Sequence, residues 1–186
     1  MLGSFQAVFI DRDGTIGGGD NVVYPGDFEL FPYALDAIKQ LKRSNIKVFS
    51  FTNQPGIGKR GATKEDFEIE LTRLGFDKVY ICPHQHGEGC HCRKPSAGML
   101  LKAARENHLD LSRCVVIGDR WTDLLAADEA GCSKILVKTG AGKDEWNKYI
   151  NNEFFGHWAE VTPDYIASDL GDAVNWLLFF DKGKYK

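Results

Sequence analysis

The sequence of 186 residues contains no uninterrupted apolar run long enough to cross a bilayer, which takes about 20 residues. It also contains no internal repeat and no low-complexity tract. Charge of one sign is not in excess, because 23 Lys and Arg against 26 Asp and Glu give a formal net charge of -3. We therefore expect neither a membrane partner nor a nucleic-acid partner.

Cysteine is scarce and odd in number. Five cysteines cannot all pair in a disulfide framework, and three of them crowd into the short segment 82–92. Such crowding favours metal ligation in a reducing compartment. The first residues carry no basic segment followed by an apolar one, so no secretory signal is predicted. Together these features predict a cytoplasmic protein.

Apolar residues make up 43% of the chain and charged residues 26%, so residues 1–186 are predicted to form a single globular domain. Apolar runs and helical periodicity alternate along it. Strands are expected at 5–10, 46–52, 79–82, 114–118, 134–137 and near 165, and helices at 32–43, 63–74, 96–108, 121–130, 144–152 and 169–179. Thr63 with Asp66, and Ser96, are predicted helix caps. This alternation predicts a three-layer, Rossmann-like α/β fold with a parallel sheet.

Polar side chains follow several of the expected strands. Asp11 and Asp13 end the first strand, Thr52 and Asn53 end the second, and Asp119 with Asp123 follows a later one. The carboxyl ends of parallel strands are where ligand sites form. Two close carboxylates suit a hard cation such as Mg²⁺, or a nucleophile beside a general acid. Taken singly, each residue could instead close a turn, cap a helix or carry surface charge.

Four segments in this order resemble the haloacid dehalogenase-like phosphohydrolases. They are Asp11-Arg12-Asp13-Gly14-Thr15, Thr52-Asn53-Gln54-Pro55-Gly56, Arg93-Lys94-Pro95 and Gly118-Asp119-Arg120-Trp121-Thr122-Asp123. The likeness runs from about residue 5 to residue 140. A Cys/His-rich loop narrows it to the subgroup that includes heptose bisphosphate phosphatases and histidinol-phosphate phosphatases.

The resemblance implies that Asp11 attacks phosphorus and forms an aspartyl-phosphate. Asp13 would protonate the leaving oxygen and then activate water. Mg²⁺ would bind the Asp11 carboxylate, the Asp13 backbone carbonyl and Asp119. Asp123 would orient this metal site without contacting the ion.

The resemblance also implies a phosphate-binding set. Thr52 and Asn53 would donate hydrogen bonds to phosphoryl oxygens. Lys94 would hold Asp11 and the transferring group by charge. Arg93 could fork onto a phosphate or onto another substrate oxygen.

The Cys/His-rich loop spans residues 82–92, with Cys82-Pro83-His84 followed by Cys90-His91-Cys92. Three thiolates and one imidazole make a closed tetrahedral zinc site of structural type. The ligands of the subgroup carry over as Cys82, His84, Cys90 and Cys92. His86 and His91 remain alternatives for the histidine ligand. The ion would fix the loop that leads into the Arg93-Lys94 pair.

The intervals between the motifs are too short for an inserted cap domain, so an open site is expected. The aromatic residues of segment 146–158 (Trp146, Tyr149, Phe154, Phe155 and Trp158) are outside the resemblance. Packing on the core is the favoured interpretation, with a dimer surface or a lip over the site as alternatives. The protein is expected to be a monomer or a homodimer.

The leading functional hypothesis is a Mg²⁺-dependent phosphomonoesterase that acts on a small phosphorylated metabolite. A sugar (heptose) bisphosphate comes first because segments 56–61 and 64–67 resemble that branch, and histidinol phosphate is the runner-up. From another class, the chain could be a catalytically silent, zinc-stapled interaction module. A nucleic-acid 3′-end phosphatase is disfavoured by the negative net charge.

Overall fold

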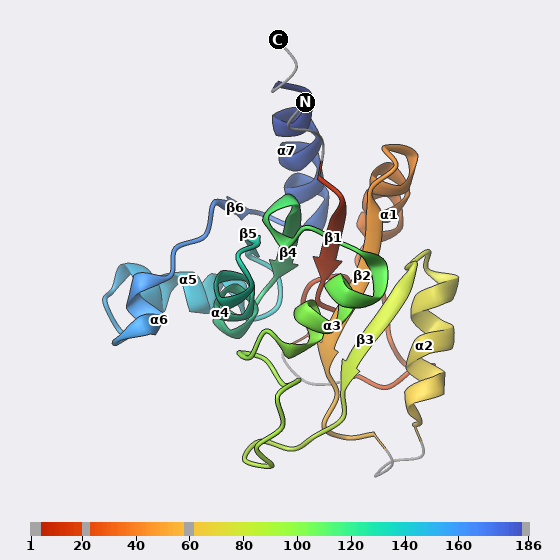
Figure 1. Cartoon of the computed structure of the whole chain (residues 1–186), viewed down its shortest axis with the longest axis horizontal. Coiled ribbons are helices and arrows are strands. Elements are labelled where there is room, and N and C mark those ends of the chain that lie inside the picture. The colour runs from red at the N-terminus through yellow and green to blue at the C-terminus, as the bar shows by residue number, and fades with distance from the viewer. Residues whose placement is uncertain (1–4, 20–22, 58–61, 184–186) are drawn as a thin grey trace.

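The computed structural model describes residues 5–19, 23–57 and 62–183. These form a six-stranded parallel sheet in the order β3-β2-β1-β4-β5-β6 (Figure 1). The strands are β1 (Ala7–Ile10), β2 (Lys47–Asn53), β3 (Lys78–Cys82), β4 (Cys114–Gly118), β5 (Ser133–Val137) and β6 (Tyr165–Ala167). The parallel α/β sheet predicted from the alternation of elements is confirmed.

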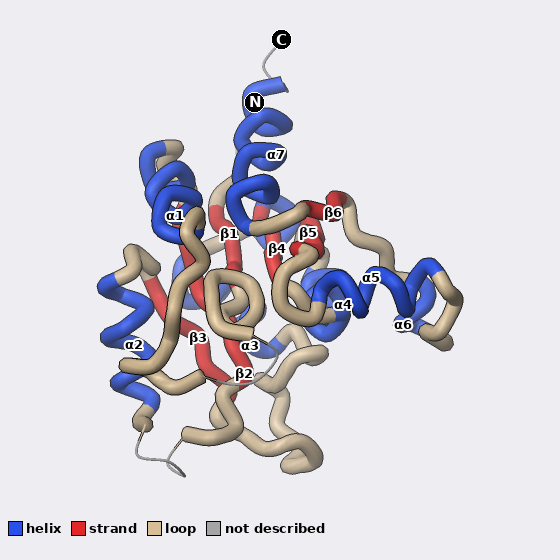
Figure 2. Tube along the Cα trace, turned by 180° about the vertical axis from the view of Figure 1, so that it is seen from behind, coloured by secondary structure: helices blue, strands red, loops and turns tan. Residues whose placement is uncertain are grey.

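Helices cover both faces of the sheet. They are α1 (Ala34–Arg43), α2 (Lys64–Arg73), α3 (Gly98–Asn107), α4 (Trp121–Ala130), α5 (Gly142–Ile150), α6 (His157–Glu160) and α7 (Leu170–Gly183), with a short 3-10 helix at Leu111–Arg113. Figure 1 shows α3 and α4 in front of the sheet, and Figure 2 shows α1 and α7 on the other side. Helices α5 and α6 project to one side beyond α4, and we call residues 142–160 the α5–α6 arm.

The sequence of β1 explains the three layers. Val8 and Ile10 pack against α1 and α7, whereas Ala7 and Phe9 pack against α3 and α4. All four residues are fully buried. Successive side chains of a strand point to opposite faces, so a strand covered on both faces must be apolar throughout.

The order of the strands places a crevice at the end of β1. After β1 the chain moves outward to β2 and β3, then returns to the other side of β1 as β4 and continues outward. Such a reversal opens a crevice at the carboxyl ends of the two central strands. Ile10 pairs with Ser50 of β2 and Ile117 of β4, so Asp11 is the first residue beyond the paired strand.

The helix caps agree in part with the sequence analysis. Thr63 and Asp66 form the predicted capping box of α2. The prediction for Ser96 is wrong, because α3 begins at Gly98 and the Ser96 hydroxyl instead donates to the His91 carbonyl over 3.0 Å.

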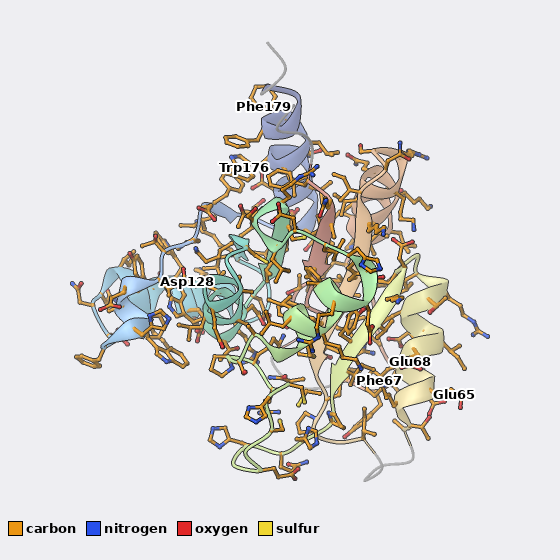
Figure 3. The ribbon with its side chains drawn as sticks, viewed as in Figure 1. Glu65, Phe67, Glu68, Asp128, Trp176 and Phe179 are labelled. Carbon is orange, nitrogen blue, oxygen red and sulfur yellow. The ribbon has the colours of Figure 1, made fainter. Side chains whose placement is uncertain are left out.

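Figure 3 shows Phe67 pointing from α2 toward the sheet, while Glu65 lies on the outer side of that helix.

The described residues leave no interval for a cap domain. Between Asp13 and Thr52 they form loops, α1 and β2, and between Asn53 and Lys94 they form α2, β3 and the Cys/His-rich loop. Residues 58–61, part of the segment likened to the heptose branch, lie outside the described residues. Across residues 5–19, 23–57 and 62–183, no helix has the length and apolar character needed to cross a membrane.

Candidate active site

Two carboxylates lie at the carboxyl edge of the sheet, directly after β1. Asp11 lies one residue past β1 and is still tied to the sheet, because its backbone N–H donates to the Ile117 carbonyl of β4 over 3.0 Å. Only 7% of the Asp11 side chain and 13% of the Asp13 side chain are exposed. The backbone turns at Gly14 with φ of 81°, and a Cβ there would lie 2.1 Å from a carboxylate oxygen of Asp119. Glycine at position 14 thus permits both the turn and the close approach of Asp119.

The Asp13 carboxyl is held at both oxygens. Oδ1 accepts hydrogen bonds from Arg12 Nη1 (2.8 Å) and from the Val23 backbone N–H (3.2 Å). Oδ2 accepts one from the Gln54 side-chain amide (2.6 Å). Burial raises the pKa of Asp13 above its ordinary value, and the contacts with Arg12 and Gln54 lower it by less. A fixed carboxyl with a raised pKa suits a group that donates a proton at neutral pH.

Arg12 supports Asp13 from inside the protein. Its side chain is fully buried, and Nε and Nη2 lie 2.8 and 2.7 Å from the same carboxylate oxygen of Glu70 on α2. The guanidinium carbon lies 3.6 Å from the centroid of the Phe28 ring, a favourable cation–π arrangement. Sequence analysis assigned no role to Arg12. Its place between two aspartates that share one side was a signal, since the middle residue must point the other way, into the fold.

Lys94 bridges the nucleophile candidate and a second buried acid. Its Nζ lies 2.9 Å from Asp11 and 2.6 Å from Asp123, and it donates to the Phe51 carbonyl over 3.2 Å. Burial alone would lower the pKa of Lys94, but the two carboxylates raise it above its ordinary value. The ammonium therefore stays charged at neutral pH. Asp123 also accepts a hydrogen bond from the Arg120 backbone N–H over 3.0 Å, which fixes the start of α4.

Asp119 follows β4 and faces Asp11. One oxygen accepts from the Ala141 backbone N–H over 2.9 Å, and the other accepts from the Thr15 hydroxyl over 3.4 Å. One oxygen each of Asp11, Asp119 and Asp123 lies within 4.8 Å of the other two.

These three buried acids place more negative charge in the crevice than Lys94 neutralises. Burial, with the neighbouring carboxylates, raises the pKa of Asp119 to about 8. Burial also raises the pKa of Asp123 to about 6, although Lys94 opposes this. A divalent cation with oxygen ligands would remove this repulsion, so the donor set fits Mg²⁺.

The end of β2 brings three polar side chains to the same edge. Thr52 accepts a hydrogen bond from the Gln54 amide over 2.9 Å, so its own hydroxyl proton can be donated elsewhere. The Asn53 side chain pairs with the backbone of Lys94, accepting from its N–H (3.1 Å) and donating to its carbonyl (3.3 Å). Gln54, to which sequence analysis gave no role, therefore links Thr52 to Asp13. Its position directly after two predicted site residues was the only sequence signal.

The Cys/His-rich loop gathers four potential ligands beside the site. The Cys82 sulfur lies 3.6 Å from that of Cys90 and 3.5 Å from His84 Nδ1, which lies 3.2 Å from the Cys92 sulfur. A tetrahedral zinc ion with ordinary bond lengths would separate such ligand atoms by about 3.5–3.8 Å. The spacing therefore fits zinc, and Arg93 secures the loop by donating to the His84 carbonyl over 3.0 Å.

The two alternative histidines lie elsewhere. Among the described residues, one of the two groups that could hold a metal ion consists of Cys82, His84, Cys90 and Cys92, and neither His86 nor His91 belongs to it. His91 contributes its carbonyl oxygen to the bond with Ser96. His86 lines the cavity at the ends of the strands. Sequence spacing did not decide which of these three histidines is the ligand. In the fold, His84 lies beside the three cysteines, and the other two lie in different surroundings.

A cavity of about 350 Å³ joins six of the predicted residues, whereas Asp119 and Asp123 are not among those that line it. Its lining includes Asp11, Asp13, Thr52, Asn53, Arg93 and Lys94, together with Pro55, His86, Pro95, Arg120, Thr122 and Trp158. A larger cavity of about 450 Å³ lies on the outer side of β3 and contains none of the catalytic carboxylate candidates. The volume beside the carboxylates is in the range of small-molecule sites, about 300–1,000 Å³.

Comparisons with known proteins point to one family. Residues 18–131 match the family model of haloacid dehalogenase-like hydrolases, and residues 91–173 match a second, HAD-hydrolase-like model. The chain is 34% identical to the D-glycero-beta-D-manno-heptose-1,7-bisphosphate 7-phosphatase of Escherichia coli (strain K12), with 92% of this chain and 93% of the relative covered. It is 35% identical to the enzyme of that name from Yersinia pestis, with 100% of both chains covered.

A solved structure agrees with these matches. It is the D,D-heptose 1,7-bisphosphate phosphatase from B. bronchiseptica, complexed with magnesium and phosphate. It superimposes with a TM-score of 0.77 at 30% identity, and the match covers 94% of this chain and 99% of that one.

Proposed function

The chain belongs to the haloacid dehalogenase-like hydrolases and is a phosphatase, and from this premise we propose that it removes one phosphate from a heptose bisphosphate. The observation that carries the proposal is the gathering of Asp11, Asp13 and Lys94 in one cavity with Thr52 and Arg93. A nucleophile, a proton donor and fixed positive charge are the groups that phosphoryl transfer needs. The silent zinc module weighed from the sequence is set aside, because the chain is an enzyme.

In the first step, a carboxylate oxygen of Asp11 forms a bond to phosphorus, and the bond between phosphorus and the sugar oxygen breaks. Asp13 transfers its proton to that leaving oxygen, which departs as a sugar hydroxyl. Its raised pKa favours the protonated form that this step requires. Lys94 lies 2.9 Å from Asp11 and offsets the charge that gathers around the phosphoryl group.

In the second step, the aspartyl-phosphate is hydrolysed. Asp13, now a carboxylate, takes a proton from water as the water oxygen bonds to phosphorus. The bond between phosphorus and Asp11 breaks, and inorganic phosphate is released. Arg12 and Gln54 keep the Asp13 carboxyl in one position for both roles.

We assign the Mg²⁺ site to the Asp11 carboxylate, the Asp13 backbone carbonyl and Asp119. Mg²⁺ would supply positive charge between an anionic nucleophile and an anionic substrate. Asp123 is assigned a supporting role, because its oxygens contact Lys94 and the Arg120 backbone. Thr52 and Asn53 are assigned to the phosphoryl oxygens. Thr52 would donate its hydroxyl proton. The Asn53 side chain is already paired with the backbone of Lys94, so backbone N–H groups would be the other donors.

The preference for a bisphosphate is supported by additional basic groups around the cavity. Arg93, Arg120 and His86 line it together with Lys94. The guanidinium groups of Arg93 and Arg120 add to the ammonium of Lys94, and because guanidinium can bind phosphate in a bidentate way, they offer charge for a second phosphate on the same sugar. The curated relatives, which are heptose 1,7-bisphosphate 7-phosphatases, support the same substrate class.

We assign a structural Zn²⁺ to Cys82, His84, Cys90 and Cys92. Four protein ligands close the coordination shell, so this ion would shape the loop before Arg93 and take no part in the reaction. Thiolate ligands of this kind need a reducing compartment, which supports a cytoplasmic location.

A panel assay tests the proposal. Phosphate release is measured with Mg²⁺ from D-glycero-D-manno-heptose 1,7-bisphosphate, histidinol phosphate and other phosphorylated metabolites. We expect the highest kcat/KM for the heptose bisphosphate. A higher kcat/KM for histidinol phosphate would assign the runner-up activity instead. Turnover of no sugar phosphate would overturn the proposed substrate class.

A further inference from the structure

One wall of the catalytic cavity comes from a part of the chain that the proposed reaction does not use. Trp158 on α6 lines the cavity together with Asp11 and Asp13. It lies in the aromatic segment 146–158 and follows all four of the segments that carry the chemistry. Its side chain is a large aromatic group that remains 38% exposed. A partly exposed aromatic residue in the lining of a catalytic cavity offers apolar surface to a ligand.

The position of Trp158 is fixed from the catalytic side of the fold. Its carbonyl oxygen accepts a hydrogen bond from the indole N–H of Trp121 over 2.8 Å. Trp121 is fully buried and lies two residues after Asp119. The Trp158 ring also lies 5.7 Å from the ring of Phe154, which in turn lies 4.8 Å from that of Trp121. The same residue therefore anchors both the start of α4 and the wall of the cavity.

The rest of the arm supports this anchor. Tyr149 stacks on Trp121 at 4.9 Å, and Trp146 stacks on Tyr149 at 5.4 Å. Glu145 accepts a hydrogen bond from the Trp121 backbone N–H over 3.0 Å. Trp146, Tyr149 and Phe154 pack on the core, as the sequence analysis favoured, whereas that interpretation is wrong for Phe155, which is 82% exposed. Trp158 differs from them, because it lines the cavity.

We propose that Trp158 is a substrate-binding residue that packs its indole ring against the apolar C–H groups of the sugar leaving group. This inference rests on the proposed function and specifies how that site selects a sugar. A sugar presents polar hydroxyls at its edges and C–H groups on its faces, so an aromatic wall binds a face while Arg93 and Arg120 meet charge. Binding energy from this non-reacting part would orient the scissile phosphate toward Asp11.

Kinetics with two substrates test the proposal. The substrates are the heptose bisphosphate and acetyl phosphate, whose leaving group has no sugar ring. For Trp158→Ala we expect kcat/KM to fall about 10- to 100-fold on the heptose bisphosphate and to change less than about twofold on acetyl phosphate. Trp158→Phe should recover most of the loss, since it keeps an aromatic face.

Phe155→Ala is the matched control. Phe155 belongs to the same arm but is 82% exposed, and it is not among the residues that line the cavity. It should leave both activities unchanged. If Trp158→Ala fails to fold, Trp158→Leu provides the same comparison with more of the apolar bulk retained.

Equal losses of kcat/KM on the two substrates would show a structural role for Trp158 and overturn the proposal. An unchanged kcat/KM of Trp158→Ala on the heptose bisphosphate would also overturn it. The substrate preference of the wild-type protein tests the proposed function independently of the Trp158 variants. If it prefers another sugar phosphate, the proposed substrate is wrong, and the Trp158 comparison is made with that sugar phosphate. If it hydrolyses acetyl phosphate but no sugar phosphate, both proposals are wrong.

Discussion

The fully buried guanidinium of Arg12 and the partly exposed carboxylate of Glu70 form an ion pair, with Arg12 Nη2 2.7 Å from Glu70 Oε1. The two residues are 58 positions apart in the sequence. Arg12 is fully buried and also contacts Asp13, the proposed proton donor. Helix α2 therefore helps to hold Asp13 through Arg12, which contacts both Glu70 and Asp13.

We predict that Glu70→Ala lowers the free energy of unfolding by about 2–4 kcal/mol, because it leaves a buried guanidinium short of its counterion. The remaining bonds of Arg12 to Asp13 and to the Val23 carbonyl (2.6 Å) keep the loss from being larger. Activity should also fall, since Asp13 would lose its fixed position. Urea unfolding monitored by circular dichroism and a phosphate-release assay measure the two effects.

Glu68→Ala on the same helix is the control. Glu68 pairs with Lys64 at 3.1 Å, but both side chains are about half exposed (42% and 54%), and exposed pairs contribute about 0–1 kcal/mol. The two glutamates are separated by two positions on α2, so the comparison isolates the buried partner. A Glu70 variant as stable and active as the Glu68 variant would show that Arg12 does not need this ion pair.

Asp11→Asn should lower turnover by at least about a thousandfold, because an amide cannot form the aspartyl-phosphate. The fold should survive, since Lys94 keeps its contacts with Asp123 (2.6 Å) and with the Phe51 carbonyl (3.2 Å). Thermal unfolding should give a Tm at or above that of the wild type, because one of three mutually repelling carboxylates is removed. Turnover near the wild-type rate would refute the assignment of Asp11 as nucleophile.

Asp13→Asn should separate the two steps of the reaction. Nitrophenol is a good leaving group and needs little protonation, so nitrophenyl phosphate should still phosphorylate Asp11. Hydrolysis of the intermediate needs the Asp13 carboxylate as base and should be slow. Rapid mixing should therefore show a burst of about one nitrophenol per chain, followed by slow turnover. Steady release without a burst would contradict the role of Asp13 in the second step.

Much of the fold followed from the sequence because its elements have strong local signals. The fully apolar strand β1 ends abruptly at Asp11, and the predicted helix 121–130 matches α4, which ends before a left-handed Gly131. Short elements were missed. Helix α6 has four residues and the 3-10 helix at Leu111–Arg113 has three, too few to show a helical period.

The positions of site residues could be predicted where they follow from the local conformation of one segment. They could not be predicted where they depend on contacts between segments far apart in the sequence. Asp11 and Asp13 follow from two-residue alternation after a strand. The partnership of Arg12 with Glu70 depends on how α2 packs, which no local pattern encodes. Which histidine lies beside the three cysteines of the loop depends on the path of that loop, which no local pattern encodes. The place of Trp158 at the cavity depends on tertiary contacts of the arm, among them the hydrogen bond from the Trp121 indole to the Trp158 carbonyl.

Magnesium should stabilise the protein in a pH-dependent way. In the metal-free protein the pKa of Asp119 is raised to about 8 and that of Asp123 to about 6, against an unfolded value of about 3.9. The folded state then binds more protons than the unfolded state between about pH 4 and pH 8, so stability falls as pH rises through this window. Mg²⁺ needs the ionised carboxylates, so its stabilising effect should grow over the same window.

Thermal unfolding with and without Mg²⁺ at pH 5 and pH 8 measures this effect. At a Mg²⁺ concentration of about 100 times Kd, the gain at pH 8 should approach about 2.7 kcal/mol, and it should be much smaller at pH 5. Asp119→Asn should abolish the gain at both values. Activity should vanish with a chelator and return with Mg²⁺ alone. A protein that is fully active without a divalent ion would exclude this site.

The last prediction concerns the Cys/His-rich loop. Elemental analysis of the purified protein should find about one tightly held zinc ion per chain. Cys90→Ser and Cys92→Ser should lose the ion and lower the Tm, because the free energy of metal binding contributes to folding. Activity should fall indirectly, since the loop leads into Arg93, which is held by the His84 carbonyl.

The two histidine variants make this prediction specific. His84→Ala should lose zinc like the cysteine variants, because His84 Nδ1 lies 3.2 Å from the Cys92 sulfur. His86→Ala should retain zinc and change only the kinetics, because His86 lines the catalytic cavity. Loss of zinc from the His86 variant would show that the ligand assignment is wrong at that position. Freely titrating thiols in the wild-type protein would refute the structural zinc site altogether.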